Sequence, residues 1–329
     1  MNNPNTSYQH QLNLILQSKK VVLSTHRNSD GDGIGSLVAL YWALKQLGKQ
    51  ATFFPVDEVP KRYNYMLDNV EISANYETLD ADLLIILDTN QGALCDPLFQ
   101  ICLKKKTHIL FIDHHVEQTQ DNPLIQKMLN LNAASTGEIV FDIIKNLNVQ
   151  LNDQIATALY SSLTFDTQAF KLVKNSSRSH YIAGELVTYK INTEKIQRNL
   201  FANWTPDKMQ FLAELIQNTR YYSNQTIAGH KVTLEQLERY HLQGDDINDL
   251  IDMFTLIPTV KFVFLIRQSY KNEFKISFRS ALSNYAYLAA CNLGGGGHYN
   301  SSGTWMTKNS IDEVEESVLT ELRNLKLLN

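Results

Sequence analysis

The sequence predicts an α/β fold, in which an N-terminal, mostly parallel sheet with helices on both faces is followed by a smaller α+β domain. Short apolar runs, such as those at residues 82–88 and 108–112, alternate with segments whose apolar residues recur at helical spacing. Continuous apolar runs are typical of strands that are buried on both faces, and their alternation with helices indicates a parallel sheet. Beyond residue 220, alternating apolar and polar residues are typical of half-buried strands instead.

The expected elements of the first half follow in order. Strands are expected at residues 21–23, 50–56, 82–88 and 108–112. Helices are expected at residues 7–18, from Gly33 onward, near 94–105, and at 135–147, 153–165 and 177–190. Right-handed crossovers bring the residues that follow parallel strands to one edge of the sheet. On that edge we expect Asp30, Asp32, Asp88 and Asp113.

The second half begins with residues 193–218, which are expected to form one polar connecting helix. Strands are then expected at residues 226–234, 260–269, 273–279 and 303–307, and helices at 284–292 and 311–325. The predicted domains are therefore a catalytic domain over residues 1–190, a helical linker over 191–219 and a smaller α+β domain over 220–329.

The composition is that of an ordinary soluble globular protein, with 43% hydrophobic and 19% charged residues in a chain of 329. The N-terminus lacks the pattern of a signal peptide, and no apolar run approaches the roughly 20 residues that span a bilayer. A cytoplasmic protein without a membrane partner is expected.

The net charge of −4 disfavours binding to long duplex nucleic acid, but it allows a short phosphorylated ligand. The three cysteines form no C-x-x-C pair, so neither a thiolate zinc site nor a disulfide framework is predicted.

Residues 21–40 predict a strand, a polar turn with His26, Asp30 and Asp32, and a helix. An EF-hand loop would need Asp or Asn where Ile34 stands. A dinucleotide fingerprint would need G-x-G-x-x-G, but these glycines alternate, and two aspartates would repel a pyrophosphate. Taken alone, the stretch is also compatible with a surface turn.

Six candidate metal ligands fall at the ends of expected strands or helices. They are His26, Asp30, Asp32, Asp88, His114 and Asp166. Each of them alone could be a turn or capping residue, but together they offer mixed oxygen and nitrogen ligands, which suit Mn²⁺, with Mg²⁺ or Fe²⁺ as alternatives. Four carboxylates separated by about 4–5 Å repel one another by several kcal/mol, so two divalent ions are expected. Such a pair predicts hydrolysis of phosphoesters.

A second set of residues is expected to support the metal site and to bind the substrate. Asp113 is expected to orient a metal-bound imidazole and His115 to face the substrate, although His115 is also compatible with a buried core position. In the C-terminal part, Arg279 and the glycine run before His298 are candidates for binding phosphate, although four glycines alone also suit a flexible loop. The glycines proposed to bind substrate are Gly295, Gly296 and Gly297.

Together these segments resemble the DHH phosphoesterases. H-R-N-S-D-G-D-G-I-G-S (26–36), L-D-T-N (87–90), D-H-H (113–115) and L-T-F-D-T (163–167) are similar to that family's four ordered motifs. S-F-R-S (277–280) and G-G-G-G-H (294–298) resemble the DHH-associated-1 substrate-binding domain. The length resembles that of small bifunctional members, which trim very short RNA and remove the 3′-phosphate from adenosine 3′,5′-bisphosphate (pAp).

The resemblance implies roles for individual residues. One metal ion would be held by His26, Asp30 and Asp88, and the other by Asp32, Asp88, His114 and Asp166. The implied catalytic residues are Asp88, Asp113, His114 and His115. The implied substrate-binding residues are His115, Ser135, Thr136, Arg279, Gly295, Gly296, Gly297 and His298. Ser29 replaces the usual proline, Gly33 replaces the usual alanine, and the glycine run has one extra member.

Several alternatives remain open. A phosphodiesterase for the linear dinucleotide pApA would differ in substrate but not in chemistry. An inorganic pyrophosphatase shares the metal motifs but not the arrangement around Arg279, and processive single-strand DNA exonucleases are longer. A nucleotide-binding module without activity is disfavoured because no ligand is missing. A homodimer is left open.

Overall fold

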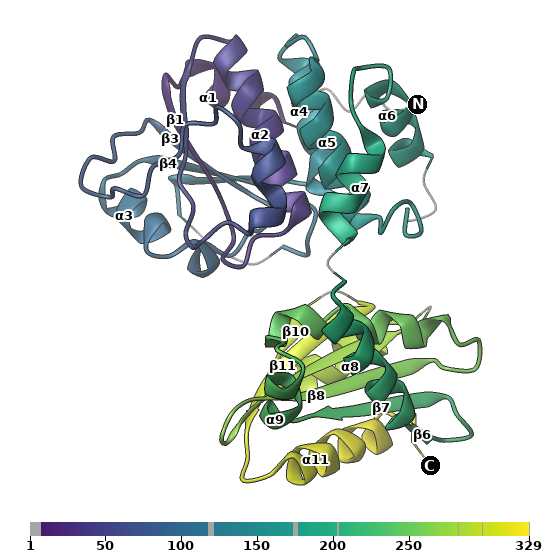
Figure 1. Ribbon diagram of the computed structural model, residues 1–329. Coiled ribbons are helices and arrows are strands. Elements are labelled where there is room, and N and C mark those ends of the chain that lie inside the picture. The colour runs from purple at the N-terminus through teal and green to yellow at the C-terminus, as the bar shows by residue number, and fades with distance from the viewer. Residues whose placement is uncertain are drawn as a thin grey trace. The chain divides into compact units, whose positions relative to one another are not determined.

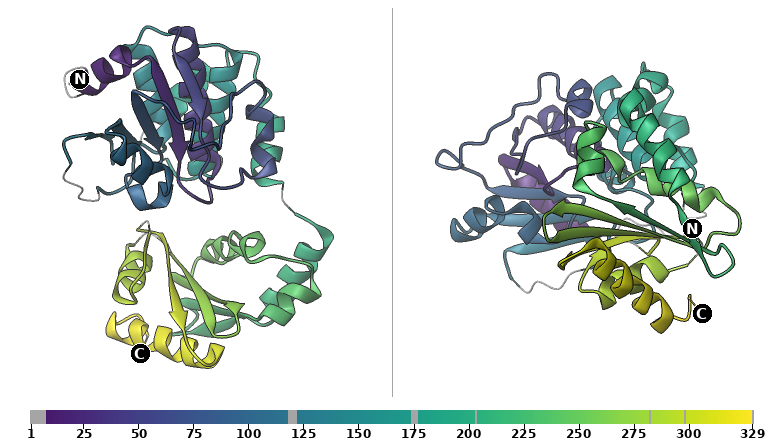
Figure 2. Two further views of the ribbon diagram at one scale, coloured as in Figure 1. Left: turned by 90° about the vertical axis from the view of Figure 1, so that its left-hand side faces the viewer. Right: turned by 60° about the horizontal axis from the view of Figure 1, so that its bottom comes forward.

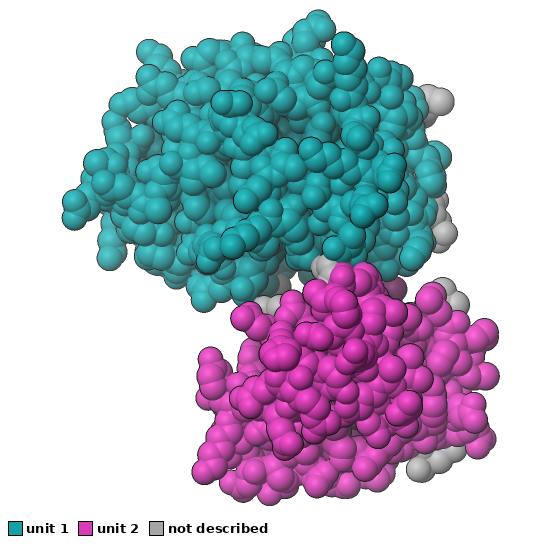
Figure 3. Space-filling model, in the orientation of Figure 1, with its two compact units in different colours: residues 1–202 teal, residues 203–329 magenta. Residues whose placement is uncertain are grey.

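The chain divides into two compact units, Met1–Ala202 and Asn203–Asn329, coloured teal and magenta in Figure 3. The structure, a computed structural model, describes residues 8–117, 122–173, 177–202, 204–281, 283–297 and 299–328. His298, expected to bind substrate, therefore lies outside the described residues. No helix among those described combines the length and the apolar character that crossing a bilayer requires.

The described residues of the first unit form a five-stranded parallel sheet with the order β2-β1-β3-β4-β5. The strands are β1 (Lys20–Thr25), β2 (Gln50–Phe53), β3 (Leu83–Leu87), β4 (His108–Asp113) and β5 (Ile125–Leu129). The predicted parallel sheet is confirmed. The edge strand β5 was not predicted, because its sequence IQKML mixes polar with apolar residues and most of its residues are only partly buried.

Helices cover both faces of this sheet, as predicted. Leu83, Ile85 and Leu87 pack into the core beneath α1 (Gln9–Gln17), α2 (Gly31–Gln46), α4 (Thr136–Asn146) and α5 (Asp153–Asp166). Leu84 and Ile86 point to the opposite core, which contains η3 (Gly92–Cys95) and α3 (Leu98–Lys104). The helices α6 (Arg178–Leu186) and α7 (Thr193–Phe201) pack on α5, and the short η2 (Lys61–Met66) contacts α2. Figures 1 and 2 show this layering.

Two predicted helices are interrupted by proline. The helix expected near residues 94–105 is divided into η3 and α3 before Pro97, where Asp96 is extended, as residues before proline prefer. The helical segment expected over residues 193–218 is helical but is not continuous. It is divided into α7 in the first unit and α8 (Pro206–Gln217) in the second, because Thr205 caps α8 and Pro206 occupies its first turn.

The described residues of the second unit form a six-stranded mixed sheet with the order β10-β11-β9-β8-β7-β6. The strands are β6 (Arg220–Tyr222), β7 (Ile227–Val232), β8 (Phe262–Tyr270), β9 (Glu273–Ser280), β10 (Gly296–Gly297) and β11 (Ser301–Thr307). One face packs on α10 (Tyr285–Asn292) and α11 (Ile311–Asn324). The other packs on α8, α9 (Leu234–Arg239), η4 (Gly244–Ile247) and η5 (Leu250–Leu256). The smaller α+β domain is thus confirmed, with short elements that the sequence pattern did not predict.

A close approach of α2 to α5 gives the first testable prediction. A Cβ added at Gly35 would lie 2.6 Å from the carbonyl oxygen of Ala158 and 2.8 Å from the amide nitrogen of Ser162. Because these are backbone atoms, Gly35→Ala is predicted to lower the free energy of unfolding by roughly 1–3 kcal/mol, measured by denaturant titration. Gly184→Ala on α6, where a Cβ meets nothing within 4 Å, is the control and is expected to stabilise by up to about 1 kcal/mol. Equal effects of the two substitutions would contradict the close packing.

Candidate metal centre

The candidate site lies at the carboxyl ends of three neighbouring parallel strands. His26 follows β1, Asp88 follows β3, and Asp113 is the last residue of β4. Asp32 lies in the first turn of α2, and Asp166 is the last residue of α5. The fold thus gathers side chains from separate segments at the edge of the sheet where ligands bind in α/β proteins.

The potential ligand atoms form three groups, within each of which all atoms lie within 4.8 Å of one another. The groups are His26, Asp30 and Asp88; Asp32, His114 and Asp166; and Asp88, Asp113, His114 and His115. The six residues expected to hold metal ions all belong to these groups, and Asp88 and His114 each belong to two of them.

Asp88 is central to the site. Its Oδ1 lies 3.6 Å from Nε2 of His114, and its Oδ2 lies 3.5 Å from Nε2 of His26. The two oxygens of this carboxylate therefore face different groups, which is the geometry of a bridging ligand. The backbone of Asp88 has a φ of +63°, a left-handed conformation that is uncommon outside glycine and occurs at functional sites.

His114 brings the second group together. Its Nε2 lies 3.0 Å from Oδ2 of Asp166 and 3.7 Å from Oδ2 of Asp32. Its other ring nitrogen, Nδ1, lies 3.3 Å from the carbonyl oxygen of Ala133. That second contact fixes the ring orientation with Nε2 directed at the carboxylates.

Asp30 connects the site to the start of α2. Its Oδ1 accepts hydrogen bonds from the amides of Asp32 (2.9 Å) and Gly33 (3.1 Å), so the residue is also the N-cap of the helix. A Cβ added at Gly33 would lie 2.4 Å from Oγ1 of Thr25. The glycine that replaces the usual alanine here therefore allows β1 to approach the helix closely.

Asp32 is fully buried and accepts several hydrogen bonds. Its Oδ1 accepts from the hydroxyls of Ser36 (3.0 Å) and Ser162 (2.5 Å). These serines were not predicted to belong to the site. For Ser36 the signal was present in the sequence, because a residue four positions after Asp32 lies on the same face of the helix. Ser162 comes from α5, and nothing in the local sequence relates it to Asp32.

The N-terminus of α4 also contacts the carboxylates. Asp32 accepts from the amides of Thr136 (2.7 Å) and Gly137 (3.3 Å), where the helix dipole favours a negative charge. The hydroxyl of Thr136 donates to Oδ1 of Asp88 at 3.0 Å. Ser135, the N-cap of α4, is buried with its Oγ 3.4 Å from that of Ser162. Thr136, expected to bind substrate, thus contacts two of the clustered carboxylates.

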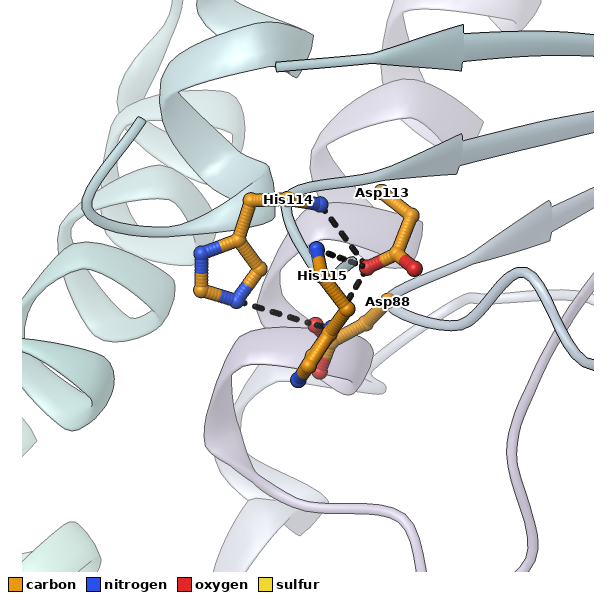
Figure 4. Close-up of side chains that lie close together, drawn as sticks. All are labelled: Asp88, Asp113, His114 and His115. Carbon is orange, nitrogen blue, oxygen red and sulfur yellow. Dashed lines mark hydrogen bonds and ion pairs between the residues drawn. The ribbon is translucent and has the colours of Figure 1, made fainter. Parts of the chain in front are cut away.

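The Asp113 carboxylate contacts the two histidines that follow it in the chain, as Figure 4 shows. Its Oδ1 accepts from the backbone amide of His114 at 2.8 Å and lies 2.6 Å from Nδ1 of His115. Its Oδ2 accepts from Nδ2 of Asn90 at 2.6 Å. Burial alone would raise the pKa of Asp113, but the hydrogen bonds from His115 and Asn90 and the neighbouring imidazoles lower it. Asp113 therefore orients the His115 ring, and Asn90, within the L-D-T-N segment, is a site residue that the sequence analysis did not single out.

The electrostatics of the cluster favour a bound cation. Burial, followed by the neighbouring Asp166 carboxylate, raises the pKa of Asp32 to about 6. Burial and the repulsion from Asp32 raise the pKa of Asp88 well above its ordinary value. Carboxylate and imidazole donors without thiolate suit Mn²⁺, Mg²⁺ or Fe²⁺, so the donor set fits the expected divalent ions.

The remaining predicted residues lie in the second unit. Arg279 is on β9, where its Nε donates to Oδ1 of Asp252 and its Nη1 to the Phe278 carbonyl at 3.0 Å. The amide of Gly295 donates to the carbonyl of Ala290 at 2.7 Å. Gly296 and Gly297 form β10 and pair with Gly303 and Ser302 of β11.

Known proteins support the resemblance. Residues 20–163 match the model of the DHH family, N-terminal domain. The chain is 26% identical, over 98% of its length, to a bifunctional oligoribonuclease and PAP phosphatase NrnA from Thermus thermophilus, of which 96% is covered. It is 23% identical, over 93% of its length, to a cyclic-di-AMP phosphodiesterase GdpP from Geobacillus thermodenitrificans, of which 47% is covered.

A solved structure supports the fold. The chain aligns with an exopolyphosphatase-related protein from Bacteroides fragilis with a TM-score of 0.86, at 22% identity and with 96% of each chain covered. The match of residues 20–163 to the DHH family model confirms the resemblance to that family predicted from the N-terminal motifs.

The raised pKa of Asp32 predicts a pH dependence of stability. Between about pH 4 and 6 the metal-free folded protein retains a proton on Asp32 that the unfolded chain releases, so stability is lost as the pH rises through this range. Asp32→Asn cannot ionise. Its stability relative to wild type in chelator is therefore predicted to increase by about 2–3 kcal/mol between pH 4 and 7.5, measured by denaturant titration.

Added Mn²⁺ provides the control for that experiment. Metal ions that bind the folded state stabilise it, so saturating Mn²⁺ at pH 7.5 is expected to favour wild type over Asp32→Asn. If the difference in stability between Asp32→Asn and wild type in chelator does not change with pH, the pKa of Asp32 is not raised in the folded protein.

Proposed function

We propose that this chain is a manganese-dependent phosphoesterase of the cytoplasm. Its proposed substrates are short oligoribonucleotides, which it hydrolyses to 5′-mononucleotides, and pAp, which it hydrolyses to AMP and phosphate. The observation that carries the proposal is the cluster of carboxylates and imidazoles around Asp88, present in a DHH domain. Similarity along almost the whole chain to a protein named as an oligoribonuclease and PAP phosphatase supports the choice of substrates.

The ligand groups suggest how two ions would be held. We assign one ion to His26, Asp30 and Asp88, and the other to Asp32, Asp88, His114 and Asp166. Imidazole ligands favour Mn²⁺, with Mg²⁺ or Fe²⁺ as alternatives. When bound, such ions supply a water of lowered pKa and positive charge beside the phosphate.

The protein's own groups would orient the phosphoester. During hydrolysis a water oxygen bonds to phosphorus, the bond from phosphorus to the ester oxygen breaks, and that oxygen leaves with a proton. Asp113 lies beside Nδ1 of His115, so in its imidazolium form His115 would donate from Nδ1 to Asp113 and from Nε2 to a phosphate oxygen. Thr136 and Ser135 act by positioning the carboxylates and the start of α4.

The second unit is assigned to substrate binding. In this proposal residues 1–190 belong to the catalytic domain and 220–329 to the DHH-associated-1 domain, and the segment 191–219, expected as a linker, is divided between the two units at Ala202. Arg279 presents a planar guanidinium suited to a phosphate, and Asp252 fixes its orientation. Gly295, Gly296, Gly297 and His298 complete the proposed phosphate-binding segment.

A second candidate substrate is pApA, the linear dinucleotide that cyclic-di-AMP hydrolysis yields. Similarity to a cyclic-di-AMP phosphodiesterase favours this candidate, although the chain spans about half of that relative. The chemistry at phosphorus would be the same. Turnover of pApA without turnover of pAp or longer RNA would select this alternative.

The bridging position of Asp88 predicts a loss of all metal-dependent activity in Asp88→Asn. Losing an outer partner of a metal ligand costs roughly 10- to 100-fold, so losing a ligand that two ions share is expected to cost more than roughly 100-fold. The assay measures release of phosphate and mononucleotide from pAp, pApA, a five-nucleotide RNA and pyrophosphate, with Mn²⁺ and with chelator.

The matched control is Asp153→Asn, at an exposed position on α5, which is expected to behave as wild type. Near-normal turnover in Asp88→Asn would show that the centre is misassigned. Fast hydrolysis of pyrophosphate without release of nucleotides would instead identify a pyrophosphatase.

Arg279→Ala is predicted to raise KM for pAp by roughly 10-fold or more, because hydrogen bonds to a charged group are lost. Hydrolysis of a minimal artificial phosphodiester should change little, since that compound lacks the second phosphate. Arg279→Lys keeps the charge but not the planar fork, and an intermediate KM is expected. An equal loss on both substrates would count against a role in recognition.

A further inference from the structure

The sheet of the second unit has a face that its helices do not fully cover. Phe274, Ile276 and Phe278 of β9 pack into the core with α10 and α11. Side chains alternate along a strand, so Lys275 and Ser277 point to the opposite face. On that face the apolar core beneath α8, α9 and η5 draws its strand residues from β7 and β8, not from β9 or β11.

The uncovered part of this face carries an exposed aromatic ring beside a basic side chain. Trp305 of β11 is directly opposite Lys275 of β9, and 56% of its surface is exposed. The next pair along these strands is Gly303 with Ser277, two small residues. On this face of β9 and β11, therefore, only small side chains lie between Trp305 and Arg279.

Basic residues continue along the same face. Arg267 of β8 is the cross-strand neighbour of Lys275, but it is buried against Gly244 of η4 and does not contribute to this surface. Arg279 lies four residues beyond Lys275 on β9, a separation of about 13 Å along an extended strand. Two acidic groups at this face are Asp252, which pairs with Arg279, and Glu273 near the end of β9. Lys275 and Arg279, with the small residues Ser277 and Gly303 between them, match the spacing of an extended, negatively charged ligand.

We propose that Trp305 and Lys275 form a subsite for an additional nucleotide of single-stranded RNA, beyond the phosphate group assigned to Arg279. A base stacks on the Trp305 ring, and Lys275 faces the backbone phosphate. Stacking on an aromatic ring tolerates any base, as trimming of unrelated short RNAs requires. This inference rests on the proposed function and extends it, because pAp is too short to occupy both Arg279 and this subsite.

The test compares RNA with pAp. Loss of one base–aromatic stack is expected to raise KM for a five-nucleotide RNA by roughly 10-fold in Trp305→Ala, with a change in KM for pAp below about twofold. Trp305→Phe keeps an aromatic face and should recover most of the affinity. Tyr221→Ala removes an exposed aromatic residue from β6, at the opposite edge of the sheet, and is expected to change neither KM.

A binding measurement separates this inference from the proposed function. Fluorescence anisotropy of a labelled five-nucleotide RNA in chelator needs no turnover, so it tests the subsite even if wild type proves to hydrolyse no RNA. Lys275→Gln should reduce the slope of log Kd against log salt by about 0.7, as expected for one lost phosphate contact to a single strand. Unchanged RNA affinity in Trp305→Ala, or an equal loss for RNA and pAp, would overturn the proposal.

Discussion

Mutual repulsion between buried carboxylates is the constraint on which the first unit depends. Asp32 and Asp88 lie beside each other at the end of a parallel sheet, and burial together with their like charges raises the pKa of both. The surroundings offset this repulsion with donors: the hydroxyls of Ser36, Ser162 and Thr136, and the first amides of α4. The imidazoles of His26 and His114 add nitrogen donors without adding negative charge. Divalent cations remove the repulsion directly, so the same arrangement that destabilises the metal-free protein favours metal binding.

The fold holds these groups in place through close helix packing. Asp32 and Asp166 lie on α2 and α5, whose contact depends on the missing side chain of Gly35. Asp88 leaves β3 in a left-handed conformation, and Asp113 is held by the amides of the residues that follow it. The site is thus built on rigid elements, as precise positioning of ligands requires.

Much of this architecture is predictable from the sequence because local sequence patterns indicate it. The buried strands β3 and β4 are continuous apolar runs, and the predicted ligands lie after strands or at one end of a helix. The edge strand β5 has no such run, and the break between α7 and α8 depends on the single start signal Thr205-Pro206. Long-range contacts are the least predictable: the hydrogen bond from Ser162 to Asp32 joins residues 130 positions apart, and no local pattern records it.

The number of ions is the central claim of the proposed function, in which two ions share the Asp88 carboxylate. It is tested most directly by the anomalous diffraction signal at the manganese edge from crystals grown with Mn²⁺. We predict two peaks roughly 3.5–4 Å apart, both in contact with Asp88. A single peak, or ions bound away from Asp88, would contradict a two-metal centre.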